Sequence, residues 1–345
     1  MTEPIYTQIF CTLSELDEDL NLLGSEREAR VMPKIKTASD FIAKNIGWFL
    51  PVTMTRRLNG KGEQRLYVPP LLSITSIVNY DTTLAANDYI AQPEARYWPN
   101  GPYAWLDVDH ADATNLSEWV RKDQGVVIDG KWGLYDLTES TGATLSVLQT
   151  DSDTDVHADN GDSISPGMVI LIGTEQQYVK STSAPVSAVT TITEAMDSEI
   201  SSITVANGAL VNIGEILRIG LEQMKITDIS GNECAVVRGW NKTQRASHAD
   251  NANVDVYRVF NVMRGVNGTT AAAHSINAEI LKQCVPDDIN MLCRKMAGRM
   301  LKDAQGGFSG VIGDATMGQA QYLYILPKEL NDIRNSYRII HTGTA

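Results

Sequence analysis

Two short segments of this 345-residue chain combine residue types that could perform chemistry. The segment RGVNGTTAAAH, from Arg264 to His274, places an arginine, two threonines and a histidine around two glycines. A second segment, RGWNKTQRASH, runs from Arg238 to His248 and matches the first at six of eleven positions. Such residues could hold a phosphate or exchange protons with a substrate. An enzyme seldom needs its active site twice in tandem, whereas a repeated structural unit needs its turn twice.

We therefore expect both segments to be structural turns. Asparagine and glycine readily adopt positive φ, and threonine and histidine side chains can tie a turn to a neighbouring strand. No acidic residue recurs at a fixed offset to orient either histidine as a catalytic base. The sequence thus predicts a chain that is not an enzyme, with no catalytic residue and no cofactor. The residues assigned to the turns are Arg238, Gly239, His248, Arg264, Gly265, Gly268 and His274.

One acidic segment has part of the spacing of a calcium loop. In DSDTDVHADNGD, the residues Asp151, Asp153 and Asp155 alternate as the first ligands of such a loop do. However, Val156 stands where that loop requires glycine, and the closing bidentate glutamate is missing. A solvated acidic loop is therefore favoured over a metal site.

Composition narrows the classes of function. The net charge of −13 argues against a protein that grips nucleic acid, because neutralising phosphates requires clustered Lys and Arg. The four cysteines form no CxxC pair and are expected to be reduced thiols. The start of the chain lacks the basic and apolar regions of a signal peptide, and the longest apolar stretches are too short to span a bilayer.

The middle of the chain differs from its flanks. Between Leu137 and Ile280 there are 17 acidic and 8 basic residues, and no convincing helical periodicity. The segment GMVILIGTEQQYVK, starting at Gly167, is echoed by GEILRIGLEQMKIT, starting at Gly214, with five of fourteen positions identical. This pattern predicts an all-β unit of two related modules, of which the second carries both RG turns.

The flanks contain the helical signals. Two helices are expected before Pro51, with an interruption at Pro33. A hairpin around Asn59 and Gly60 and a strand–turn–strand in GVVIDGKWGLYD follow. The clearest helix starts at Pro286 and has one apolar stripe, and a Gly-rich loop and a short helix close the chain.

The order of three flank motifs resembles the head–tail connector (adaptor) proteins of tailed bacteriophages. The motifs are TRRLNGKG…LYVPPLLSITSIVNYD, VVIDGKWGLYD and VPDDINMLCRKMAGRML. The resemblance implies an α+β protein: a helical adaptor core with a small β-hairpin and strand region, formed by residues 1–136 and 281–345, and an inserted acidic all-β domain, residues 137–280. The insert is itself similar to small β-modules of phage tail, neck and baseplate proteins.

The resemblance also implies a function. The chain would be a structural virion protein of the neck, made in the host cytoplasm, that forms a dodecameric ring, docks below the portal protein and extends the DNA channel. A tail or neck terminator protein would be a further partner, double-stranded DNA would pass without specific binding, and no membrane would be involved. The expected portal-contact segment is Ile333, Tyr337, Arg338, Ile339 and Ile340, and the expected inter-subunit helix face is Arg294, Lys295, Arg299 and Lys302.

An alternative class is a tail or baseplate component whose β-domain binds a carbohydrate or receptor. Clustered exposed aromatic residues would favour it, and the insert offers four large aromatic side chains: Tyr178, Trp240, Tyr257 and Phe260. A hydrolase would need a convergent triad, for which the sequence gives no motif.

Overall fold

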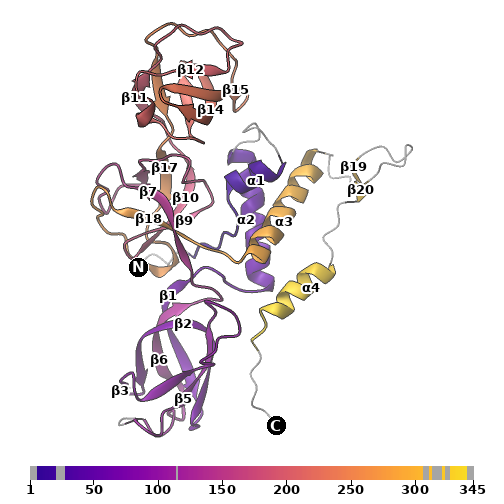
Figure 1. Ribbon diagram of the computed structural model, residues 1–345. Coiled ribbons are helices and arrows are strands. Elements are labelled where there is room, and N and C mark those ends of the chain that lie inside the picture. Colours follow the sequence, from indigo (N-terminus) through magenta and orange to yellow (C-terminus); the bar gives the residue numbers. More distant parts are fainter. Residues whose placement is uncertain are drawn as a thin grey trace.

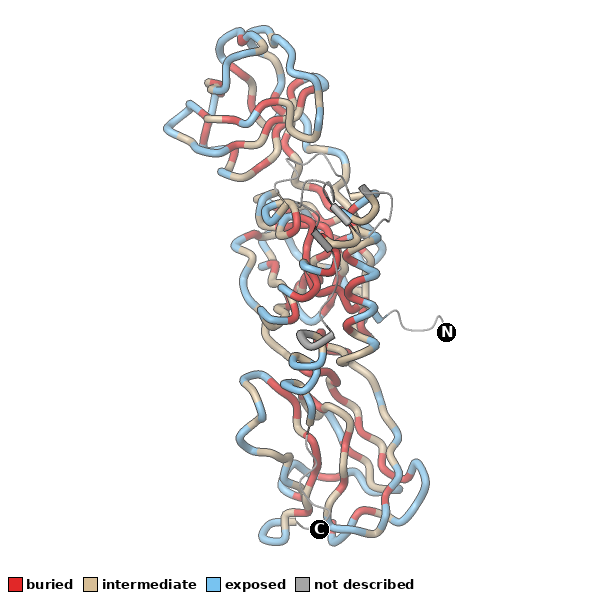
Figure 2. The backbone as a smooth tube through the Cα atoms, turned by 90° about the vertical axis from the view of Figure 1, so that its right-hand side faces the viewer, coloured by how far each residue is buried: buried red, intermediate tan, exposed pale blue. Residues whose placement is uncertain are grey.

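The computed structural model consists of three β-bodies in a row, with helices beside the middle one (Figure 1). It describes residues 6–20, 28–113, 116–305, 311–312, 321–322 and 327–339. Each β-body contains one six-stranded antiparallel sheet. Buried residues run through the interior of each body and between the middle body and the helices (Figure 2).

The first body, here the N-terminal sheet, is built from residues 52–132. Its strands lie in the order β1-β6-β2-β5-β4, and β3 pairs with β2. Its core contains the fully buried side chains of Trp119, Trp132 and Leu106. The strands are β1 (Val52–Gly60), β2 (Arg65–Asn79), β3 (Thr82–Thr83), β4 (Tyr89–Gln92), β5 (Tyr103–Val108) and β6 (Lys122–Trp132).

The predicted hairpin around Asn59 and Gly60 is wrong, because β1 and β2 do not pair with each other. Strand β6 lies between them and is antiparallel to both. GVVIDGKW does not turn either: Gly130 lies inside β6, opposite Met54 on one side and Ile74 on the other. A Cβ atom at Gly130 would lie 2.2 Å from the carbonyl oxygen of Ser73. This glycine therefore permits close strand approach and does not mark a turn.

The helices come from both ends of the chain and form one cluster. The apolar stripe of α3 is buried as predicted, and Asn290 donates to the carbonyl of Phe10 at 3.0 Å. Pro33 lies on the exposed side within α2 and does not interrupt it, since Ile35 and Ile42 on the opposite face stay packed in the cluster. The helices are α1 (Leu13–Leu20), α2 (Glu28–Asn45), α3 (Asp287–Gln305) and α4 (Pro327–Ser336), and the short strands β19 (Val311–Ile312) and β20 (Gln321–Tyr322) pair with each other.

The expected fold class, a helical core with a small β region, is wrong. In the part of the chain that the structure describes, four α-helices stand beside three six-stranded sheets, so this part is mainly β. The physical reason is the pairing of β6 between β1 and β2. This pairing turns segments that looked like isolated hairpins into a complete sheet with its own hydrophobic core.

The other two bodies repeat one topology, with one nested in the other. The first module has the strand order β7-β18-β9-β10-β17-β8, and the second module has β11-β16-β13-β14-β15-β12. The first consists of β7 (Thr138–Thr144), β8 (Asp155–His157), β9 (Val169–Ile172), β10 (Glu175–Thr182), β17 (Val259–Met263) and β18 (Glu279–Gln283). The second consists of β11 (Val186–Thr191), β12 (Ser202–Thr204), β13 (Ile216–Ile219), β14 (Glu222–Ser230), β15 (Glu233–Trp240) and β16 (Asn253–Val256).

The nesting corrects the expectation that the second module carries both RG turns. Strands β10 and β17 form a hairpin in space, and the whole second module is inserted at its tip, where Ser183 N–H donates to Val259 O at 2.8 Å. The turn after Arg264 therefore belongs to the first module and the turn after Arg238 to the second. In the second module, β14 and β15 form the matching hairpin without an insertion.

We expect the second module to be removable. Replacing residues 184–258 by Asn-Gly should close the β10–β17 hairpin with a two-residue turn, since Thr182 and Phe260 are already paired. The remaining chain should fold, with a melting temperature within about 4 °C of the intact first module, which corresponds to about 1 kcal/mol. Circular dichroism and calorimetry would measure this. A deletion of equal length, residues 164–238, cuts both modules and should not fold; equal behaviour of the two deletions would contradict the nesting.

Candidate functional site

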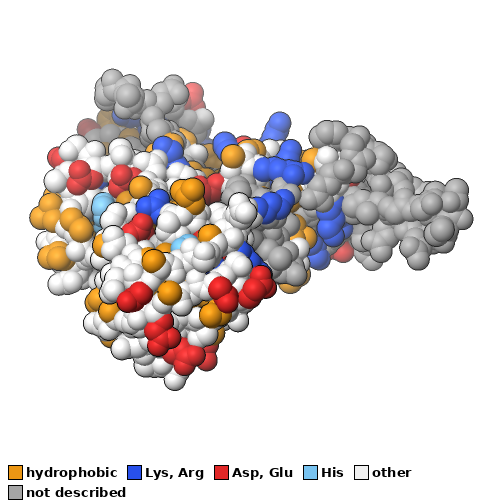
Figure 3. Space-filling view, turned by 90° about the horizontal axis from the view of Figure 1, so that it is seen from above, with side chains coloured by type: hydrophobic (Ala, Val, Ile, Leu, Met, Phe, Trp, Pro, Cys, Tyr) orange, Lys and Arg blue, Asp and Glu red, His pale blue; other side chains and the backbone are white. Residues whose placement is uncertain are grey.

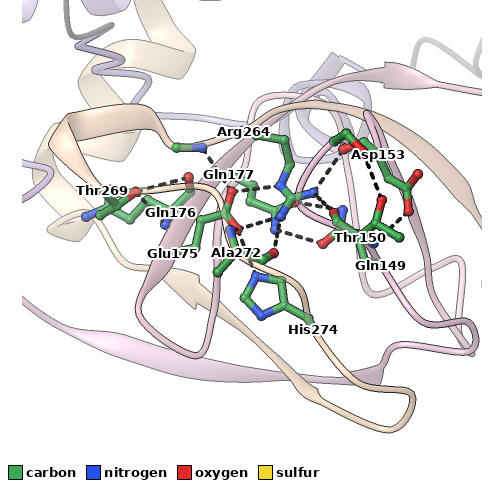
Figure 4. Close-up of polar contacts among 12 residues, drawn as sticks. Gln149, Thr150, Asp153, Glu175, Gln176, Gln177, Arg264, Thr269, Ala272 and His274 are labelled. Atoms are coloured by element: carbon green, nitrogen blue, oxygen red, sulfur yellow. Dashed lines mark hydrogen bonds and ion pairs between the residues drawn. The ribbon is translucent and has the colours of Figure 1, made fainter.

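The two RG segments build two copies of one polar cluster, each centred on a buried glutamate. In the first module, Glu175 stands at the start of β10 (Figure 4). Its carboxylate accepts from Arg264 Nε and Nη2, both at 2.7 Å, and lies 2.8 Å from His274 Nε2. The backbone N–H groups of Gly265 and Ala272 donate to the same carboxylate at 3.0 and 3.1 Å. We call this set the first Glu-Arg-His cluster.

The arginine of this cluster also binds the loop between β7 and β8. Arg264 Nη1 donates to the carbonyl oxygens of Thr150 and Asp153, at 2.7 and 2.9 Å, and Nη2 donates to Ala272 O at 2.6 Å (Figure 4). All three guanidinium nitrogens of Arg264 therefore have acceptors. One guanidinium thus holds together the start of β10, its own turn and a loop that lies more than a hundred residues earlier in the chain.

The second module repeats this arrangement atom for atom. Glu222 accepts from Arg238 Nε and Nη2 at 2.7 and 2.6 Å, and His248 Nε2 lies 2.9 Å from its Oε2. Gly239 and Ala246 supply the two backbone N–H groups. Arg238 Nη1 donates to two carbonyls of the β11–β12 loop, those of Asp197 and Ile200. This is the second Glu-Arg-His cluster.

Both carboxylates are held in their ionised form. Burial alone would raise the pKa of Glu222, but the hydrogen bonds from Arg238 and His248 outweigh burial and lower that pKa to about 2. The same opposing causes lower the pKa of Glu175. The side chains of both glutamates are at most 1% exposed. A buried carboxylate is tolerated only when paired and hydrogen-bonded, which is the case here.

The hydrogen bonds of these clusters serve a structural role. Each carboxylate accepts five hydrogen bonds or ion pairs, so it has no lone pair directed at a substrate proton. Each arginine is saturated by carboxylate and carbonyl oxygens, which leaves no fork of N–H groups for a phosphate. The arrangement closes a loop over the end of a sheet and fixes its conformation.

Sequence reasoning missed the two glutamates. No acidic residue stands at a fixed offset from the two histidines, because each glutamate lies outside the RG segments, in the echoed segments that start at Gly167 and Gly214. Glu175 and Glu222 occupy the same position in the echoed GTEQQ and GLEQM segments. The signal in the sequence was a glutamate at the same position of both echoed segments, two residues after an Ile-Gly pair.

The glycines of the two RG turns are required for different reasons. Gly265 and Gly239 both adopt positive φ, +59° and +65°, which lets their N–H groups point at the glutamate. Gly268 lies against the N-terminal sheet, and a Cβ there would be 1.9 Å from Thr53 O. The second module has Lys242 at the equivalent position, with φ +56°.

The other predicted turn residues, Asn59 and Gly60, lie at the end of β1 in the N-terminal sheet. Asn59 Oδ1 accepts from Gln124 N–H, and Gly60 ends β1 against Val120 O.

The acidic loop suggested as a calcium site supplies carbonyls to Arg264. Asp153 Oδ2 accepts from Thr150 N–H at 2.7 Å, a backbone hydrogen bond that lowers the pKa of Asp153. Asp155 Oδ1 accepts from Ser183 and Asn261, and Asp151 is exposed. Among the described residues, no group of three or more His, Cys, Asp or Glu side chains is placed to hold a metal ion.

The other segments named from the sequence lie in the helical cluster. Ile333, Tyr337 and Ile339 pack on its hydrophobic core, and Tyr337 Oη donates to Asp288 at 2.7 Å. Arg338 is exposed, and Ile340 lies outside the described residues. On α3, Arg294 pairs with Asp19, Lys295 and Lys302 are exposed, and Arg299 is half-buried.

Breaking one cluster should destabilise its module. Glu222→Gln leaves the Arg238 charge buried without its partner, so we expect the free energy of unfolding of the second module to fall by about 3–5 kcal/mol. Native-state hydrogen exchange of the amides of the second module, followed in increasing urea, would measure the loss. The half-exposed pair of Arg218 and Asp255 in the same module is the control, because Arg218→Met should cost about 1 kcal/mol or less. Equal losses would contradict the special role of the buried carboxylate.

The stability of the second module should also depend on pH in a defined window. The pKa of Glu222 lies near 2 in the folded state and near 4.5 ordinarily, so its contribution is complete above about pH 4.5 and is lost as pH falls toward 2. The shift corresponds to about 3 kcal/mol. Urea midpoints between about pH 5 and pH 3 should therefore fall more steeply in the unmodified chain than in Glu222→Gln. Parallel slopes would disprove the assignment.

Comparisons of the chain with protein-family models, with curated proteins and with solved structures find no match. Among the described residues, no helix is long and apolar enough to cross a membrane. The function must therefore be inferred from the geometry of the chain itself.

Proposed function

We propose that this chain is a structural subunit of the neck of a tailed bacteriophage, a head–tail adaptor that forms a ring below the portal protein and extends the DNA channel. Its work is geometric: identical subunits pack head to tail until the ring closes. A dodecamer is the size that the resemblance implies. The observation that carries this proposal is the meeting of the two chain ends in one helical cluster.

If a domain is inserted into an adaptor, the segments before and after the insert must pack together in one core. Helices α1 and α2 precede the inserted β-modules and α3 follows them, yet all three pack around one core. Cys11 Sγ and Cys293 Sγ, 282 positions apart in sequence, lie 3.2 Å apart in that core. The first module lies between the helical cluster and the N-terminal sheet in the fold, which supports an insertion of residues 137–280 (Figure 1).

The charge distribution suits a channel that lets DNA pass. Viewed from above, basic side chains gather on the side of the helices, while acidic side chains are spread over the side of the second module, which lies nearest the viewer (Figure 3). The exposed basic residues of α3 include Lys295 and Lys302. In a ring, this side could face the acidic body of the next subunit, and the net charge of −13 would keep DNA from binding tightly.

A second candidate is a tail or baseplate component that binds a carbohydrate or receptor. One observation favours it: Trp240, Tyr257 and Phe260 border one cleft. However, Phe260 is 2% exposed, so it offers no flat face to a sugar ring.

Electron microscopy separates the two candidates. The purified chain should form closed rings, and an antibody against the second module should label the junction of head and tail on the intact particle. Charge reversal at Lys302, which is exposed on α3, should weaken the ring, whereas reversal at Lys36, whose partner Asp40 is on the same helix, should not. Labelling of the distal tail, with a monomeric purified chain, would contradict the adaptor and favour the receptor-binding candidate.

A further inference from the structure

The two modules share a topology, but they use one face differently. In the first module, this face carries Val169, Tyr178, Met263 and Val266, and all four pack against the core of the helical cluster. The face is therefore a docking surface within the chain. What docks there is an extended segment, Tyr6–Thr12, followed by α1.

An asparagine–glutamine pair in the first module binds backbone from outside the module, at Thr7 of the docked segment and at Pro51 just before β1. Asn267 Nδ2 donates to Gln176 Oε1 at 2.8 Å, which orients both amides. Asn267 Oδ1 then accepts from the backbone N–H of Thr7 at 2.7 Å, and Gln176 Nε2 donates to the carbonyl of Pro51 at 3.0 Å. The pair thus supplies one acceptor and one donor to extended backbone.

The equivalent face of the second module lines a cleft. The positions that match the four docking residues are Ile216, Lys225, Val237 and Trp240, and all of them border a cleft of about 800 Å³ between the second module and the ends of α1 and α2. Val237 is 39% exposed, although its counterpart Met263 packs against the core of the helical cluster. The cleft is therefore where the second module would receive a segment like Tyr6–Thr12.

The asparagine–glutamine pair is retained in the cleft, but it lacks its backbone partners. Asn241 Nδ2 donates to Gln223 Oε1, as in the first module. Gln223 Nε2 donates to Tyr257 Oη at 2.8 Å. Asn241 Oδ1 is buried and has no hydrogen-bond partner. The atom that corresponds to the acceptor of Thr7 N–H is thus the one left unsatisfied, and a buried polar atom in that state favours any ligand that donates to it.

The charges around the cleft select the kind of segment. Asp17, Glu18 and Glu28 lie on its helical side and Asp162 on the side of the first module. Lys225 is the one cation among the described lining residues, and its ammonium lies over the ring of Trp240, 5.3 Å from the centroid. Four carboxylates against one ammonium favour a cationic ligand.

We propose that this cleft binds an extended, Lys- or Arg-bearing segment of a partner protein. A backbone N–H of the segment donates to Asn241 Oδ1, an apolar side chain packs on Trp240 and Val237, and the basic side chains face Glu18 and Asp162. The occupant is a different protein rather than a second copy, because the basic segments of this chain in β1 and α3 are already held in a sheet and a helix. This inference does not depend on the neck assignment.

The test uses the full chain and a library of random linear peptides. Peptides enriched on the unmodified chain should be rich in Lys and Arg. A fluorescent copy of the most enriched peptide should bind about tenfold more weakly to Trp240→Ala and to Asn241→Ala, and Glu18→Gln with Asp162→Asn should reduce both the affinity and its salt dependence. Leu221→Ala is the matched control, since Leu221 is 92% exposed in the same module but outside the cleft, and should bind normally.

Several results would overturn the proposal. These are enrichment of neutral or acidic peptides, no enrichment over the Trp240→Ala chain, or affinities that the cleft variants leave unchanged. Dimerisation that Trp240→Ala abolishes would show that a second copy is the occupant, and a glycan that competes with the peptide would favour the saccharide site. If Trp240→Ala loses its folded circular dichroism signal, Asn241→Ala and the paired charge variant decide the question.

Discussion

The structure of both modules depends on the burial of one ionised carboxylate. A glutamate with almost no exposure to water must find all its hydrogen-bond donors inside the protein. In each module these donors are an arginine, a histidine and two backbone N–H groups of one turn. Because the same arginine binds carbonyls of a distant loop, the start of one strand, its turn and that loop must adopt a single relative position. The six strands of each module pack around a small apolar core. That core alone would not fix the loops between the strands, and the buried carboxylate does.

This constraint explains how one module can interrupt another. The β10–β17 hairpin of the first module is closed at its base by Glu175 and Arg264, so the conformation of its tip does not matter to the cluster. The inserted module enters and leaves at adjacent positions, since Val186 pairs with Val256. Neither sheet has to break for the insertion. The chain order that results is Glu175, Glu222, Arg238, Arg264, in which the outer pair and the inner pair are partners.

The sequence could predict local features well and pairings poorly. The apolar stripe of α3 and the absence of α-helix between Leu137 and Ile280 depend on periodicity, and both are confirmed; the range contains only two short 3-10 turns, Gly208–Leu210 and Val266–Gly268. The fold class failed because β6 pairs between β1 and β2, and a pairing across some seventy residues leaves no periodic signal. Gly130 looked like a turn because a glycine beside an aspartate favours one. It proved to be the place where two strands approach too closely for a side chain. Both RG turns were located correctly, but the turn after Arg264 was assigned to the wrong module, since adjacency in sequence cannot reveal nesting.

A comparison of the two modules distinguishes the contacts that hold each module together from the contacts that bind other segments. The Glu-Arg-His cluster is complete in both, so it belongs to the fold. The asparagine–glutamine pair contributes nothing to that cluster: in the first module it binds backbone from outside the module, through Thr7 and Pro51. In the second module the same pair is present, one of its oxygens is buried without a partner, and the surrounding face is open. A pair that takes no part in the Glu-Arg-His cluster, and that leaves an acceptor unsatisfied, is accounted for by a bound segment. By the same reasoning, the matching face of the first module is occupied because the chain supplies that segment itself.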